Sequence, residues 1–153
     1  MSSPARTRQL DLITLGRAAV DLYGEQIGGR LEDMSSFAKY LGGCPANIAV
    51  GAVRLGLKVG MVTRVGDDHM GRFVRETLAS EKVDVSQVKT DPTRLTALVV
   101  LGIRDSETFP LIFYRENCAD MALEAQDIDA TYIARAQALV VTGTHFSLSL
   151  IHI

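Results

Sequence analysis

A short run of small and polar residues, Gly42-Gly43-Cys44-Pro45-Ala46-Asn47, carries the clearest sign of chemistry in this sequence. Paired glycines let a ligand approach the backbone closely, and Pro45 is typical of the first turn of a helix, where N–H groups lack partners. Asn47 adds a side-chain donor and acceptor in the same turn. The run therefore predicts a site for a polyhydroxylated ligand, and a tight turn that Asn47 merely caps explains it equally well.

The sequence lacks three motifs that commonly mark nucleotide binding or nucleophilic catalysis. It contains no GxxxxGK[ST] or GxGxxG phosphate-binding loop and no GxSxG nucleophile motif. Cys44 and Cys118 form no CxxC pair, and the histidines (His69, His145 and His152) show no metal-ligand spacing with them. We expect reduced thiols and no structural metal.

Composition and charge exclude several classes of protein. The 153 residues are 47% apolar, which is enough for a buried core, and 16 Lys and Arg against 18 Asp and Glu give a net charge of −2. This balance argues against a nucleic-acid partner, and no apolar run approaches the roughly 20 residues that span a membrane. The sequence predicts a cytoplasmic protein that binds neither nucleic acid nor membrane.

Hydrophobic patterning predicts alternating strands and helices that position the glycine run. Strands are expected at residues 10–15, 18–23, 35–41, 59–65 and 138–143, the last as a buried parallel strand. Helices are expected from Pro45 to a C′ glycine at Gly56, at 69–80 behind Asp68 as N-cap, and at 129–137.

Two β segments stand apart from this alternation. Residues 96–103 and 109–115 flank a polar turn and predict a hairpin. Together with residues 18–41, the hairpin suits an accessory β layer beside an α/β layered sheet. We expect one domain, or part of one.

The glycine run and its surroundings resemble the ribokinase-like (PfkB) carbohydrate kinases. The family's first signature is similar in its glycines, its asparagine and their spacing, here at Gly42, Gly43, Asn47, Ala49, Gly56 and Gly66. Three further segments resemble the family: 16–21 as its first strand with a substrate-holding Asp, 65–71 as a VGxDxxG turn, and 113–120 as the segment from lid to domain. The resemblance covers residues 10 to about 146 and is closest to a branch that phosphorylates a sugar acid.

The resemblance implies a role for individual residues. Asp21 would accept hydrogen bonds from substrate hydroxyls, Gly43 would offer its backbone amide, and Asn47 its side-chain amide. Arg115 is the candidate partner of the substrate carboxylate, because a guanidinium binds a carboxylate through two parallel hydrogen bonds. Arg17 is the second candidate for that role. Exposed surface charge is the alternative interpretation of each ionised residue.

The resemblance also indicates what this chain lacks. Phosphoryl transfer in the family uses ATP, Mg²⁺ and a later GxGD segment, whose Asp is the catalytic base, and no GxGD occurs here. We therefore expect a ribokinase-like layered sheet with a small β lid (about 18–41 and 96–115), truncated before the nucleotide-binding half. Residues 10–147 would form this sugar-binding part, with no catalytic base, and 148–153 would be a non-native or truncated tail. Such a chain would be inactive alone.

Two other functions remain open from the sequence. One is another sugar kinase of the same family, such as a fructokinase or a 2-keto-3-deoxygluconate kinase. The other is a non-catalytic module that binds sugar or forms a homodimer through its lid strands, since an exposed strand edge is a ready pairing surface.

Overall fold

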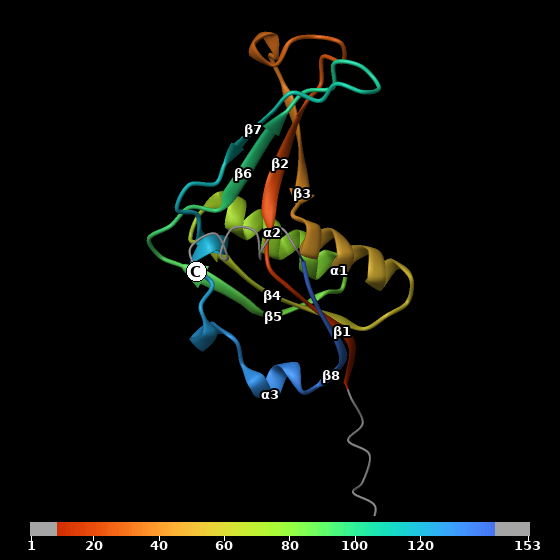
Figure 1. Cartoon of the computed structure of the whole chain (residues 1–153), viewed down its shortest axis with the longest axis vertical. Coiled ribbons are helices and arrows are strands. Elements are labelled where there is room, and N and C mark those ends of the chain that lie inside the picture. The colour runs from red at the N-terminus through yellow and green to blue at the C-terminus, as the bar shows by residue number, and fades with distance from the viewer. Residues whose placement is uncertain (1–8, 143–153) are drawn as a thin grey trace, which may run out of the picture.

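Two four-stranded β-sheets organise the chain in the computed structural model, which describes residues 9–142 (Figure 1). The larger sheet is parallel, with strand order β5-β4-β1-β8. Its strands are β1 (Leu10–Leu15), β4 (Val59–Gly66), β5 (Asp84–Asp91) and β8 (Ala136–Val141). We call it the central sheet.

Helices cover both faces of the central sheet. On one face lie α1 (Cys44–Arg54) and α2 (His69–Ser80), which share a core with the apolar side chains of β1, β4 and β5. On the other face, α3 (Ala130–Ile133) packs Tyr132 against β1 and β4. The described residues also contain three short 3₁₀ turns: η1 (Leu31–Asp33), η2 (Ala119–Ala122) and η3 (Ala125–Asp127).

The smaller sheet, which we call the lid, rises from the layered part of the molecule (Figure 1). Its strand order is β3-β2-β6-β7, with β2 (Ala19–Gly24), β3 (Phe37–Gly42), β6 (Ala97–Leu101) and β7 (Leu111–Tyr114). Leu22, Leu41 and Leu98 pack from one face of the lid onto the core that α1 and α2 share, so the two sheets are held by one continuous core. The opposite face is covered at its base, where Cys118 packs against Ala19 and Ala97, and is open farther out, where Tyr40 and Phe113 are exposed.

Most of the predicted elements are confirmed. The α/β class, the layered sheet with a small β lid, the helix at 69–80 and the antiparallel hairpin of β6 and β7 are present. Asp68 caps α2 by accepting a hydrogen bond from Gly71 N at 2.7 Å. Both cysteines are free thiols, and in residues 9–142 no helix is long and apolar enough to cross a membrane.

Three details differ from the predictions. The helix expected at 129–137 is only the four residues of α3, because β8 begins at Ala136 and its pairing with β1 competes for this segment. Strand β5 was not predicted. The 138–143 segment is a parallel strand as expected, but among the described residues β8 is the edge of the sheet, and Leu139 is exposed rather than buried.

Candidate functional site

The open face of the lid carries a row of side chains that crosses all four strands. Asp21 on β2 pairs with Tyr40 on β3 and with Val99 on β6, and Val99 pairs with Phe113 on β7. Residues paired across neighbouring strands project from the same face of a sheet. The row therefore brings Asp21, which the sequence singled out, to the middle of this open face.

Asp21 lies against the glycine pair. A Cβ atom at Gly42 would sit 2.0 Å from Asp21 Oδ1, so the carboxylate occupies the space that any larger residue would fill. No hydrogen bond to the Asp21 side chain is found among residues 9–142. Burial raises the pKa of Asp21, and the positive charge of Arg17 opposes that rise. A carboxylate without donors in a half-buried place is well suited to accept hydrogen bonds from a ligand's hydroxyl groups.

The second glycine opens α1. Gly43 is the N-cap, with φ +96°, and a Cβ there would lie 2.6 Å from the carbonyl oxygen of Arg17. A residue with a side chain is therefore excluded by both conformation and space. Pro45 stands in the first turn as predicted, and no side chain caps the helix. The first turn of α1 thus presents free backbone N–H groups beside Asp21.

Asp21 and Asn47 line one cavity of about 660 Å³. Its walls include two aromatic rings, Tyr23 and Tyr40, which meet edge to face with centroids 5.2 Å apart. The Asn47 side chain is exposed, and its amide makes no hydrogen bond to residues 9–142, so Asn47 is not the cap that the simpler interpretation of the glycine run required. The cavity combines free donors and acceptors with ring faces, which suits a polyhydroxylated ligand.

Two buried arginines stand at the end of the row beyond Asp21. Arg17 follows β1, and its guanidinium lies 5.9 Å from the Phe113 ring centroid. Arg115 follows β7 and donates to Asp120 Oδ2 at 2.9 Å, while Arg17 Nε lies 3.5 Å from the same oxygen. The two candidates for binding a carboxylate therefore share one acidic partner, and the cluster keeps an excess of positive charge.

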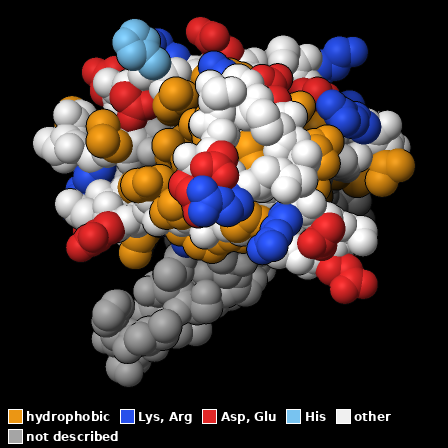
Figure 2. All heavy atoms as spheres, turned by 90° about the horizontal axis from the view of Figure 1, so that it is seen from above, with side chains coloured by type: hydrophobic (Ala, Val, Ile, Leu, Met, Phe, Trp, Pro, Cys, Tyr) orange, Lys and Arg blue, Asp and Glu red, His pale blue; other side chains and the backbone are white. Residues whose placement is uncertain are grey.

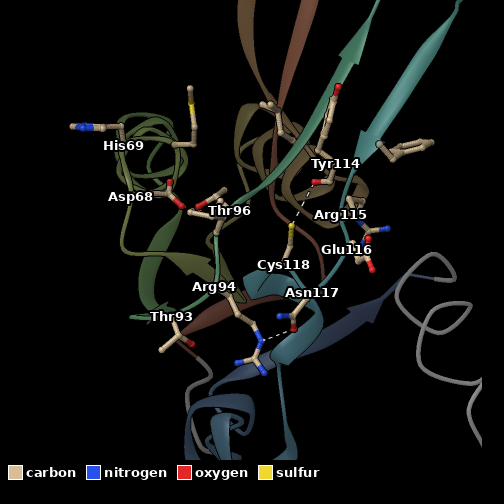
Figure 3. A pocket seen from close by; sticks show the side chains of 14 residues that line it. Asp68, His69, Thr93, Arg94, Thr96, Tyr114, Arg115, Glu116, Asn117 and Cys118 are labelled. Carbon is tan, nitrogen blue, oxygen red and sulfur yellow. Dashed lines mark hydrogen bonds between the residues drawn. The ribbon is translucent and has the colours of Figure 1, made fainter.

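A larger cavity, of about 770 Å³, includes Arg115 in its lining (Figure 3). Arg115, Asn117 and Cys118 form one wall, and Asp68 with Thr96 forms the opposite wall. Cys118 points into it and donates to Tyr114 O at 3.4 Å. Its polar groups mostly pair with each other: Asp68 accepts from Thr96 N at 2.7 Å, and Arg94 donates to Asn117 at 3.1 Å. We therefore take the smaller cavity, whose polar side chains make no hydrogen bond to residues 9–142, as the hydroxyl-binding part of the candidate site.

The structure brings only some of the sequence-predicted site residues into one cavity. Asp21 and Asn47 share a cavity, Gly43 is the N-cap of the helix that carries Asn47, and Arg17 lies within electrostatic range of Asp21. Arg115 lines the larger cavity and is linked to the others through Asp120. Asp120 was not predicted, because only the folded chain buries it and brings Arg17 to the carboxylate that Arg115 also contacts. Among residues 9–142, no group of three His, Cys, Asp or Glu side chains could hold a metal ion.

Comparison with known proteins gives a consistent answer. Residues 9–151 match the pfkB family of carbohydrate kinases. A 5-dehydro-2-deoxygluconokinase from Geobacillus kaustophilus is 42% identical over 143 residues, which are 93% of this chain and 43% of that protein. Among solved structures, a PfkB protein from Polaromonas sp. JS666 superposes with a TM-score of 0.79 at 35% identity, over 85% of this chain and 43% of the other. A sugar kinase from Pyrococcus horikoshii in complex with ATP gives 0.79 at 28% identity, over 85% and 42%. The chain thus spans less than half the length of these relatives.

Proposed function

Because this chain belongs to the pfkB family of carbohydrate kinases, we propose that it forms the sugar-binding part of a cytoplasmic kinase that phosphorylates 5-dehydro-2-deoxy-D-gluconate in myo-inositol breakdown. The activity is taken from the names of relatives about 40% identical to it, of which the Geobacillus kaustophilus protein is one. The observation that carries the proposal is the row from Asp21 to Phe113, which leads from a hydroxyl-binding end to an arginine pair.

Each end of the row has a distinct task. At one end, Asp21 accepts hydrogen bonds from the sugar hydroxyls, while Asn47 and the first-turn amides of α1 donate to its oxygens. At the other end, Arg17 and Arg115 bind the carboxylate. Hydrogen bonds to charged groups contribute about 1.5–3 kcal/mol each, so both ends add specificity as well as affinity. A ligand with hydroxyls at one end and a carboxylate at the other matches this arrangement.

The family implies ATP and Mg²⁺ as well as a sugar. Residues 9–142 contain no metal-binding cluster, and the glycine-opened end of α1 borders the Asp21 cavity rather than a separate phosphate site. These observations support a sugar-binding role for the described residues, and we propose that this chain holds no tightly bound nucleotide. We expect the 153-residue chain alone not to transfer phosphate from ATP to 5-dehydro-2-deoxy-D-gluconate. ADP production that co-purifies with the chain and is lost in Asp21→Ala would contradict this expectation.

Calorimetric titration of the chain tests the binding function. We expect 5-dehydro-2-deoxy-D-gluconate to bind at least tenfold more tightly than the neutral ketose D-fructose, because only the acid reaches the arginine pair. Asp21→Asn, which keeps the shape and removes the charge, should weaken binding of both ligands. Equal affinity for the two ligands would instead favour a fructokinase, and binding of neither would overturn the proposal.

The lid edge supports a second proposal, a homodimer. Strand β7 is an edge of the lid, and its four residues Leu111, Ile112, Phe113 and Tyr114 are all exposed. Seen from the lid end, hydrophobic side chains lie open between the charged ones (Figure 2). Exposed apolar edges favour pairing with another strand. Sedimentation velocity should show a dimer that Ile112→Lys dissociates, and a wild-type monomer at high protein concentration would refute it.

A further inference from the structure

Asp120 is a buried carboxylate that sits between Arg115, which is close to it in the sequence, and Arg17, which comes from the connection between β1 and β2. It lies in η2, with only 1% of its side chain exposed, and its Oδ2 faces both Arg17 Nε and Arg115 Nη2. The two arginine side chains are themselves about nine-tenths buried, with 9% and 11% exposed. Buried charges are normally paired and fully hydrogen-bonded. If the role of this cluster were only structural, each of its buried nitrogen and oxygen atoms should therefore have a hydrogen-bond partner.

The cluster is not satisfied by residues 9–142. The Nε atoms of Arg17 and Arg115 and the Oδ1 atom of Asp120 are buried without a hydrogen-bond partner. The terminal nitrogens of Arg17 also make no hydrogen bond to a described side chain or carbonyl. One oxygen of Asp120 therefore holds two guanidinium groups in place and leaves most of their donors free. Free donors at a buried, charged position suit an anionic ligand.

The charges of the cluster set what that anion can be. Two arginines and one aspartate give 2 − 1 = +1. Burial, and after it the charge of Arg115, lowers the pKa of Arg17, and the negative charges of Asp120 and Asp21 oppose that fall. Asp21 also lies toward the hydroxyl end and opposes any further negative charge. A ligand with one negative charge balances the cluster, and a ligand with two leaves a buried charge uncompensated.

We propose that Asp120 is a positioning residue that makes the Arg17–Arg115 pair selective for a carboxylate with one negative charge over anions with two, such as sulfate or a sugar phosphate. This inference rests on the proposed function and adds to it the reason for its substrate charge. Asp120 does not contact the ligand. It acts by holding the two guanidinium groups and by removing one of their two positive charges.

Competition between two anions tests the selectivity. The 153-residue chain is titrated with 5-dehydro-2-deoxy-D-gluconate and with sulfate, for the wild type and for Asp120→Asn, which keeps the shape and removes the charge. We expect the wild type to bind the sugar acid at least tenfold more tightly than sulfate. In Asp120→Asn this preference should fall at least tenfold, because sulfate gains a second positive charge to pair with.

Asp127→Asn is the matched control, since Asp127 lies in η3 and pairs with Arg64, 3.1 Å away and outside the cluster. It should leave the preference unchanged. If Asp120 were only structural, Asp120→Asn would lower the melting temperature and weaken both anions alike, and that result would overturn the inference. Should Asp120→Asn not fold, the wild type still decides, because equal or tighter binding of sulfate contradicts the selectivity.

A nitrogen-15 spectrum gives an independent readout. The Nε–H signals of Arg17 and Arg115 should shift when the wild type binds the sugar acid and stay unmoved with D-fructose. In one outcome the wild type binds the sugar acid, Asp21→Asn weakens that binding, and the Nε–H signals do not shift. This outcome would support the sugar-binding function and refute the role of the arginine cluster. Loss of all sugar binding in the wild type would refute both.

Discussion

Gly42→Ala should abolish most of the sugar binding while leaving the fold almost unchanged. The new methyl group would lie 2.0 Å from Asp21 Oδ1 and 2.3 Å from its Cγ, so the carboxylate must rotate away. Gly42 does not have a positive φ, so alanine fits the backbone, and the displaced group is the end of a short, partly exposed side chain. We therefore expect the free energy of unfolding to fall by about 1 kcal/mol, which is the low end of the usual cost of overpacking.

The loss of binding follows from the hydrogen bonds that Asp21 would make. A hydrogen bond to a charged acceptor contributes about 1.5–3 kcal/mol, which is roughly a ten- to hundredfold change in the dissociation constant. Calorimetric titration with 5-dehydro-2-deoxy-D-gluconate measures it directly. Because the methyl group acts only through Asp21, the double variant Gly42→Ala with Asp21→Asn should bind no more weakly than Asp21→Asn alone.

A second glycine provides the matched control. Gly51 lies in α1, and a Cβ atom there would meet nothing within 4 Å. Gly51→Ala should leave sugar binding unchanged and stabilise the protein by roughly 0.5–1 kcal/mol, because alanine favours helix more than glycine does. Gly42→Ala that binds the sugar acid within twofold of wild type, or a double variant with additive losses, would show that Asp21 is not the group that holds the hydroxyls.

The remaining predictions concern pH and stability. Since burial raises the pKa of Asp21, sugar affinity should fall with decreasing pH and begin to do so above the ordinary value of 3.8, whereas Asp21→Asn should remove this dependence in calorimetry. Asp91→Asn should cost about 3–5 kcal/mol in urea unfolding, because Asp91 is buried and pairs with Arg64 at 3.1 Å and Arg94 at 3.2 Å. Burial alone would raise the pKa of Asp91, but hydrogen bonds from the Thr93–Arg94 turn outweigh it and hold this pKa well below 3.8. The ionised Asp91 therefore stabilises the folded protein above pH 3.8, and this stabilisation is lost as the pH falls below that value. In Asp91→Asn the free energy of unfolding should depend less on pH in the acid range. Tyr132→Phe should cost about 1 kcal/mol by thermal unfolding, because the hydroxyl donates to Asp84 Oδ2 at 3.1 Å, and an unchanged melting temperature would contradict it.

Local signals explain which parts of the fold the sequence predicts well. Helix α2 runs over the residues expected from its apolar spacing, because Asp68 caps it and Val74 and Leu78 bury one face. Strand β5 escaped prediction for the opposite reason. It is a polar edge strand, and Val88 is its only buried apolar residue. Its hydrogen-bonded pairing with β4 makes this segment a strand, although its own sequence shows no strand pattern.

The candidate site also has residues that the sequence predicts and contacts that only the fold reveals. Gly43 and Asn47 lie within one short run of the sequence and could be recognised from their spacing. The pairing of Arg17 and Arg115 through Asp120 could not, because it joins the β1–β2 connection to the segment after β7. A sequence records that both arginines are present, but only the fold shows that one carboxylate serves them both. Their shared partner turned two separate candidates into a single charged cluster.

The proposed ligand contacts come from both sheets, so binding depends on how the lid stands relative to the central sheet. Asp21 lies on the lid, Asn47 lies on α1, and Arg17 lies in the connection between the sheets. Two hydrogen bonds fix the base of β6 to the layered part: Thr96 N donates to Asp68 Oδ2 at 2.7 Å, and Gly66 N donates to Thr96 Oγ1 at 3.0 Å. Neither contact involves a residue that lines the cavity of Asp21 and Asn47, yet both hold the lid against the central sheet. Under the proposed function we expect the lid angle to contribute to specificity, because a sugar acid can bridge Asp21 and the arginine pair only if the distance between them matches its length.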